Sequence, residues 1–282
     1  MASFVVYTYQ FAPIFGDTRS LFPNMYPDAE TVWEKKQEVF ASIFDKIVFR
    51  KRNIYGHDII VNENNIIVLR LANNRHIVQE SSFVAKKLDH HPSCYVIIDN
   101  RKDVQNIFIE QKPYSFEDTD VVAKILSITF NIYLKSYNLS VEINKRYIPQ
   151  EFWQVVESEG KGVDMLRFSF LYPNLPRVQE KIDEILSKAS SQVHSKNTVV
   201  EFNSGDNEAL DINKDNQDLQ NLVKAASESG STIKLKFKGY RRHTTIGTSS
   251  EIVEIDNFDA SLTSDLMSKA IQKIITILNK FK

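Results

Sequence analysis

The chain has 282 residues, of which 42% are hydrophobic and 25% charged, so its composition is that of a folded globular protein and excludes a largely disordered one. Its 35 Lys and Arg balance 36 Asp and Glu, which excludes a domain that binds nucleic acid through net charge alone. One cysteine, Cys94, excludes an internal disulfide, and no apolar run reaches the roughly 18 residues of a membrane span. We therefore expect a cytoplasmic protein without a membrane segment.

The N-terminal part of the chain predicts a strand followed by a helix. Large side chains alternate with smaller or polar ones from Val5 to Phe11, which is the two-residue period of a half-buried strand. Asp28 is a candidate N-cap for a helix that continues to Ile47 with aromatic residues along one face. We expect this helix to pack on a sheet.

Residues 48–112 predict an antiparallel β meander, because short β-rich runs alternate there with polar turns. The run from Cys94 to Glu110 has the form of a hairpin, and we place the centre of its turn between residues 101 and 102. A helix capped at Asp118 or Thr119 follows, then a strand at LSVEI and a short helix from Glu151 to Val156.

The segment SEGKG, residues 158–162, is the best candidate for a domain boundary, because it places two glycines and two charges between patterned segments. It predicts an N-terminal domain of residues 1–158 and a smaller one of residues 163–282. In the second domain the patterns follow the order βαβαββα, with a helix opened by PNLP, a helix ending at Gly230 and a final helix around residues 262–278. The fold class is therefore α+β.

One short motif points to an enzyme. Glu110-Gln111-Lys112 at the end of a strand matches the ExK element of metal-dependent nucleases, in which a carboxylate binds Mg²⁺ and a lysine orients the attacking water. A turn centred between residues 101 and 102 pairs Asp99 with Val104 and places Glu110 opposite Ser93, at the far end of the hairpin. Asp89 is then the better second carboxylate, so the alternative function is an Mg-dependent nuclease that uses Asp89, Glu110 and Lys112. Solvated polar residues at a strand end would give the same pattern.

The chain offers little else for catalysis. It contains none of the GxxxxGK[ST], GxGxxG, GxSxG or HExxH motifs, and its six histidines lack the spacing of a zinc site. We predict no cofactor and no metal, and the sequence favours a protein that is not an enzyme.

The segment TIKLKFKGYRRHTT, residues 232–245, predicts a basic β-hairpin. Its lysines project from one face of a strand and its apolar residues from the other, before the chain turns at Gly239. Five cations close to an aromatic ring suit contact with a phosphate backbone and stacking on a base. The predicted binding residues are Lys234, Lys236, Lys238, Tyr240, Arg241 and Arg242. The competing explanation is an edge strand that lysines protect against aggregation.

These patterns together predict a non-catalytic binding protein that contacts nucleic acid, or an acidic protein partner, through the basic hairpin. The Asn-, Lys- and Ile-rich composition is typical of AT-rich bacterial genomes and fits an accessory component of a phage-defence or mobile-element system. Besides the nuclease, a second alternative is a non-enzymatic subunit of an oligomer or larger protein complex.

Overall fold

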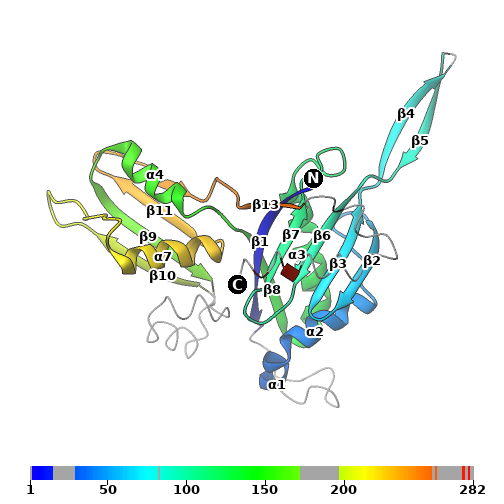
Figure 1. The fold of residues 1–282 in the computed structure, drawn as a ribbon, viewed down its shortest axis with the longest axis horizontal. Helices are drawn as coiled ribbons and strands as arrows, with labels where there is room; N and C mark the ends of the chain where they lie inside the picture. Colours follow the sequence, from blue (N-terminus) through cyan, green and yellow to red (C-terminus); the bar gives the residue numbers. More distant parts are fainter. Residues whose placement is uncertain are drawn as a thin grey trace. The chain divides into compact units, whose positions relative to one another are not determined.

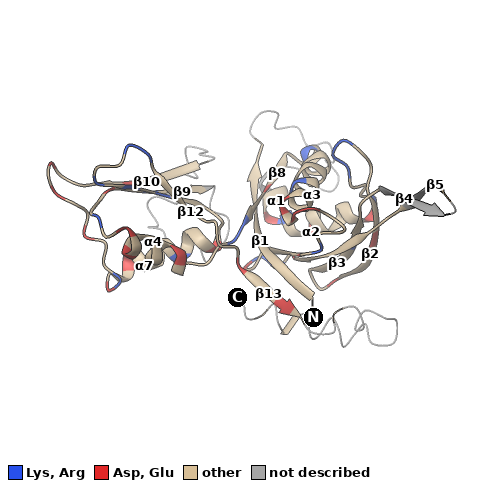
Figure 2. Ribbon diagram, turned by 90° about the horizontal axis from the view of Figure 1, so that it is seen from above, with Lys and Arg blue, Asp and Glu red and all other residues tan. Residues whose placement is uncertain are grey.

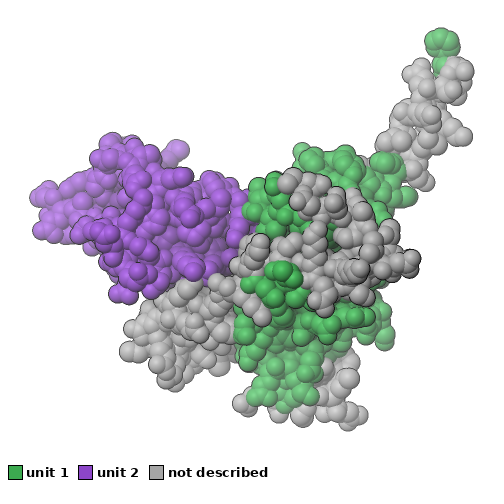
Figure 3. Space-filling view, in the orientation of Figure 1, with its two compact units in different colours: residues 1–5, 13–143, 252–282 green, residues 6–12, 144–251 purple. Residues whose placement is uncertain are grey.

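A computed structural model describes residues 2–14, 29–81, 83–171 and 197–255, together with the single positions 258, 275, 276 and 279; at 29–30, 75–81, 84–89 and 171 it describes the backbone alone. The chain divides into two compact units (Figure 3). Unit 1 contains Met1–Val5, Pro13–Ile143 and Ile252–Lys282, and unit 2 contains Val6–Ala12 and Asn144–Glu251. The domains predicted from the sequence, 1–158 and 163–282, stay a prediction about independently folding pieces.

Unit 1 is organised around a seven-stranded sheet of order β13-β1-β7-β6-β3-β2, in which β8 also pairs with β1 (Figure 1). The strands are β1 (Ala2–Pro13), β2 (Gly56–Glu63), β3 (Ile66–Ala72), β6 (Ser93–Asp99), β7 (Asn106–Glu110), β8 (Leu139–Lys145) and β13 (Ile252–Ile255). Strand β2 pairs antiparallel with β3, β3 with β6, and β6 with β7. The predicted α+β fold with an N-terminal meander is confirmed.

Helix α3 (Thr119–Leu134) packs on this sheet. The side chain of Asp118 accepts a hydrogen bond from the backbone N–H of Asp120, so Asp118 is the N-cap that the sequence predicts. Buried aromatic rings connect α3 to the helical segment of residues 36–45. The ring centroid of Phe130 lies 5.0 Å from that of Phe40 and 5.6 Å from that of Phe44. Such rings contribute both buried apolar area and favourable edge contacts to the core.

The helix predicted up to Ile47 is divided into shorter pieces. The structure has α1 (Ala29–Glu34), α2 (Lys36–Ser42) and a 3₁₀ turn, η1 (Ile43–Asp45). Lys35 separates the first two, because its φ of −96° and ψ of 17° lie outside the helical range. The proposed N-cap, Asp28, lies outside the described residues.

A separate two-stranded sheet interrupts the meander. Strands β4 (Arg75–Ser81) and β5 (Val84–His90) lie between β3 and β6 in the chain and pair only with each other. Figure 1 shows this ribbon extending away from the large sheet. Phe83, at its tip, has a φ of 64° and is 99% exposed.

The predicted register of the β6–β7 hairpin is wrong by two residues. Asp99 pairs with Asn106, and not with Val104, because the connection is longer than the sequence suggests. The backbone N–H groups of Val104 and Gln105 both donate to the carbonyl of Arg101, and Gln105 adopts a φ of 47°. An even shift leaves every side chain on its predicted face but moves Glu110 from Ser93 to Tyr95.

Unit 2 contains a four-stranded antiparallel sheet of order β10-β9-β11-β12. Its elements are α4 (Gln150–Glu159), β9 (Val163–Leu171), β10 (Asn197–Asn203), α7 (Gln217–Glu228), β11 (Thr232–Phe237) and β12 (Thr244–Ile246). Apolar residues of both helices and one face of the sheet form a single core, which includes Phe152, Phe168, Val223 and Leu235. The helix opened by PNLP and most of the final helix lie outside the described residues, and the last predicted strand, β13, pairs with β1 in unit 1.

The two ends of the segment Asn144–Glu251 lie close together within unit 2. Both β8 and β13 pair with β1, and unit 2 combines residues Val6–Ala12 of β1 with the segment Asn144–Glu251. The N–H of Arg146 donates to the carbonyl of Val6, whose N–H donates to the carbonyl of Glu251, each at 2.9 Å. The Arg146 and Glu251 side chains also form an ion pair at 2.8 Å between Nε and Oε2. The segment Asn144–Glu251 is therefore held together near its two ends by contacts between Arg146 and Glu251.

Among the described helices, none combines the length and the apolar character that crossing a bilayer requires.

Candidate functional site

The basic hairpin lies in the sheet of unit 2. Lys234 and Lys236 alternate along β11 with Ile233, Leu235 and Phe237, whose side chains are buried in the core. Strand β11 pairs with β9 on one side and β12 on the other, so it is an inner strand. Protection of an edge strand therefore does not explain its lysines.

The loop after β11 carries the remaining predicted residues. Gly239 has a φ of 81°, a conformation that favours glycine, and the chain reverses there towards β12. Lys238 Nζ donates to the carbonyl of Asn207 at 2.8 Å, so the acceptor of this hydrogen bond is a neutral group. Arg241 and Arg242 are exposed and make no hydrogen bond or ion pair within the part of the chain that the structure describes.

Tyr240 is held against the body of unit 2. Its hydroxyl donates to Glu159 Oε2 at 3.0 Å, and its ring lies 6.2 Å from that of Phe237 between centroids. Lys161 Nζ lies 4.2 Å from the centre of the Tyr240 ring, as a cation–π contact. Tyr240 as a whole residue is 37% exposed, so these contacts fix its orientation and leave part of it accessible.

Charge is distributed unequally across the layers of unit 2. Helix α4 contains three Glu and no Lys or Arg, and α7 contains Asp218 and Glu228 against Lys224. Figure 2 shows this acidic character in red on both helices. On the other face of the sheet Lys234 pairs in register with Arg167, and Arg167 Nη1 forms an ion pair with Glu201 Oε2 at 3.7 Å. The sequence analysis missed Lys161 and Arg167, because only the strand pairing and the Tyr240 contact bring them to the hairpin.

Two of the three predicted nuclease residues, Asp89 and Glu110, lie in different sheets, and Lys112 follows the end of β7. Glu110 ends β7, where its Oε2 accepts the N–H of Tyr95 at 2.9 Å and its Oε1 lies 3.7 Å from Lys112 Nζ. Asp89 lies on β5, opposite His76 in the two-stranded sheet. In the described ranges no three His, Cys, Asp or Glu residues come together in a way that could hold a metal ion. The nuclease remains a prediction.

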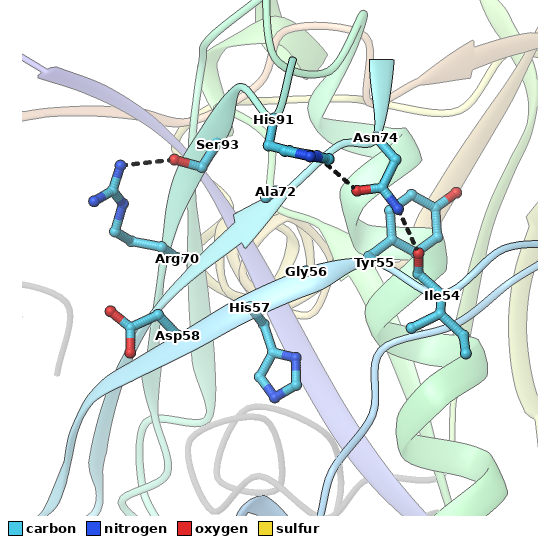
Figure 4. Close-up of a pocket in the computed structure, with 10 residues that line it drawn as sticks. All are labelled: Ile54, Tyr55, Gly56, His57, Asp58, Arg70, Ala72, Asn74, His91 and Ser93. Atoms are coloured by element: carbon cyan, nitrogen blue, oxygen red, sulfur yellow. Dashed lines mark hydrogen bonds between the residues drawn. The ribbon is translucent and has the colours of Figure 1, made fainter. Parts of the chain in front are cut away.

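A cavity of about 550 Å³ lies at one end of β2, β3 and β6 in unit 1 (Figure 4). It is lined by Ile54, Tyr55, Gly56, His57, Asp58, Arg70, Ala72, Asn74, His91 and Ser93. The sequence analysis did not find this site, because its residues come from three strands and three connecting segments and share no spacing in the chain. Only the register of the sheet places them together.

No protein-family model matches this sequence, and no curated protein matches it.

Proposed function

We propose that the protein is a non-catalytic nucleic-acid-binding protein of the cytoplasm, and that the basic hairpin of β11 and the following loop contacts the phosphate backbone. One observation carries the proposal: Lys234, Lys236, Arg241 and Arg242 make no hydrogen bond or ion pair to the described residues. Cations without a protein counter-ion are available to neutralise phosphates and to release the counterions bound there.

The surroundings support this use of the hairpin. Lys161 adds positive charge next to it, whereas Arg167, beside Lys234, is ion-paired with Glu201. The acidic helices lie on the other face of the sheet. An excess of positive charge on one face of a domain and of negative charge on the opposite face orients a charged ligand before it makes contact. Tyr240, oriented by Lys161 and Glu159, supplies a ring on which a base can stack.

The proposal also agrees with a reducing compartment. Cys94 is a buried free thiol, which needs no oxidising environment.

The test is a salt titration of binding to a DNA duplex and to a single strand of the same length. Lys234→Ser with Lys236→Ser should lower the slope of log affinity against log salt by about 1.8 on duplex DNA and about 1.4 on the single strand. The matched control is Lys46→Ser with Lys135→Ser, which removes two exposed lysines of unit 1. It should leave affinity and slope unchanged.

Two outcomes would overturn the proposal. The first is an absence of binding by the wild-type protein at low salt, and the second is an equal slope for the hairpin variant and the wild type. Polyglutamate serves as a further probe, since tighter binding to it than to either nucleic acid would favour an acidic protein partner. Tyr240→Ala should weaken single-strand binding by about 1 to 3 kcal/mol and duplex binding by less.

A further inference from the structure

The cavity of unit 1 owes its shape to three small residues. Gly56, Ala72 and Ser93 lie side by side on β2, β3 and β6, because the register pairs Gly56 with Ala72 and Ala72 with Ser93. The next row on the same face contains Asp58, paired with Arg70. Small residues beside large polar ones make a flat apolar floor with a charged wall, and the volume of about 550 Å³ is within the usual range for small-ligand sites.

The charged wall presents a donor and an acceptor together. Arg70 Nη2 donates to Ser93 Oγ at 2.9 Å, which leaves most of the guanidinium N–H groups for a ligand. Asp58 makes no hydrogen bond or ion pair to the described residues, although cross-strand neighbours lie only about 5 Å apart at Cβ. Figure 4 shows Arg70 turned towards Ser93 and away from Asp58.

The opposite wall has a fixed hydrogen-bond pattern. Asn74 Nδ2 donates to the carbonyl of Ile54 at 3.0 Å, so Asn74 Oδ1 faces His91 Nδ1 at 3.1 Å and must accept from it. In the neutral ring this leaves His91 Nε2 as an acceptor. The hydrogen bonds therefore hold His91 in one tautomer and one orientation beside the cavity.

We propose that this cavity binds a guanine base, presented as a free nucleoside or nucleotide. Guanine has two adjacent donors, N1–H and the 2-amino group, beside the acceptor O6. The Asp58 carboxylate accepts from the two donors and Arg70 donates to O6, while the planar ring lies on Gly56 and Ala72. Adenine presents a single amino donor between two ring acceptors, and uracil presents one donor between two carbonyls, so neither offers the carboxylate two donors.

Binding is measured by isothermal titration calorimetry with GMP, AMP, CMP, UMP and XMP. The wild-type protein should prefer GMP over the other four by at least about tenfold, since losing a hydrogen bond to a charged group changes affinity by that order. Asp58→Asn should weaken GMP binding by a similar factor and strengthen XMP binding. Xanthine carries a carbonyl where guanine has its amino group, so the asparagine amide can donate to it.

Two further variants separate recognition from folding. Ala72→Phe fills the floor of the cavity with a residue that strands favour, and it should abolish GMP binding with the thermal stability retained. Asp103→Asn makes the same chemical change at an exposed turn outside the cavity and should bind GMP as the wild type does. Equal affinities for GMP and AMP, no GMP binding, or an Asp58→Asn variant that binds GMP normally would each overturn the proposal.

This inference does not rest on the nucleic-acid proposal. The hairpin variant Lys234→Ser with Lys236→Ser should bind GMP normally, so either proposal can fail while the other stands. Binding of a free amino acid such as alanine in place of GMP would also overturn the guanine assignment, because it would show that Asp58 and Arg70 recognise an ammonium and a carboxylate.

Discussion

Replacing Glu151 should destabilise unit 2, because it removes the hydrogen bonds that join α4 to the segment between β12 and β13. Glu151 lies in the first turn of α4, and its carboxylate accepts the N–H of Thr248 at 3.0 Å, the hydroxyl of Thr248 at 2.6 Å and the N–H of Ser249 at 2.9 Å. Hydrogen bonds to a charged group stabilise by about 1.5 to 3 kcal/mol each. Thr248 and Ser249 are exposed, so water replaces part of what is lost. We expect Glu151→Ala to lower the free energy of unfolding by about 2 kcal/mol in total, or Tm by about 4 to 8 °C.

The effect should depend on pH. Burial raises the pKa of Glu151, but the hydrogen bonds from Thr248, Ser249 and Gly247 outweigh it, so its pKa lies below the ordinary value of 4.5. The charged form is thus favoured in the folded protein, and its stabilisation is complete above pH 4.5 and is lost as the pH falls through the lowered pKa. The difference between wild type and Glu151→Gln should therefore be largest at neutral pH and should shrink on acidification below about 4.5.

Urea denaturation followed by tryptophan fluorescence is a suitable assay. In a Trp33→Phe background the signal comes from Trp153 alone, which lies on α4 next to Glu151 and packs against the unit 2 core. Glu157→Ala on the same helix is the matched control, because Glu157 is exposed and pairs only with Lys214 among the described residues. It should cost less than about 1 kcal/mol. Equal losses for the two variants, or a Glu151→Ala loss that does not change with pH, would refute the reasoning.

Two further predictions concern buried ionisable groups in unit 1. Burial, with a contribution from the Glu110 carboxylate, raises the pKa of the Cys94 thiol to about 12. Iodoacetamide at pH 8 should therefore leave Cys94 unmodified in the native protein and should label it fully in urea. Mass spectrometry measures both outcomes. Native labelling would contradict this burial. Burial and the nearby Lys102 lower the pKa of Lys36 to about 8. Between about pH 8 and 10.5 the unfolded state therefore binds more protons than the folded state, and the free energy of unfolding of the wild type should increase as the pH rises through that range. Lys36→Met should lack this rise and be more stable than wild type at pH 7 by about 1 to 3 kcal/mol in urea denaturation; a less stable variant would show that the contact of Lys36 with Trp33 dominates.

The strands and the main helix of unit 1 could be predicted because their patterns are local. The N-cap at Asp118 and the strand from Val5 to Phe11 are each predicted from a few residues, and both are present in the structure. The predicted half-burial of that strand is wrong, because its residues from Val5 to Phe11 are buried on both faces. The register of the β6–β7 hairpin could not be predicted in the same way. The register depends on Gln105, which adopts a left-handed backbone conformation. Glycine or asparagine at this position would have predicted that conformation, but glutamine does not.

The division into units illustrates a second limit. In SEGKG, Gly160 adopts a φ of 57° as the C-cap of α4, and Gly162 lies so close to Ala209 that an added Cβ would approach Ala209 Cβ at 2.5 Å. Local packing thus explains both glycines. The chain passes between the units after Val5, Ala12, Ile143 and Glu251, and the first three of these points lie inside strands β1 and β8, where linker composition is absent. The cavity is hidden for a related reason, since it depends on pairing among β2, β3 and β6.

The position of the segment Asn144–Glu251 in the chain sets the order in which the large sheet can be completed during synthesis. Residues Ala2–Val5 of β1 pair with β13, which begins at Ile252. At about 5 to 20 residues per second, β13 is made roughly 10 to 50 s after β1. Until then this stretch of β1 lacks β13, its native neighbour on one side. An unpaired strand edge can pair with another chain. All of unit 2 from Asn144 to Glu251 is translated within that interval, so its folding can bring the two connecting segments together before β13 arrives.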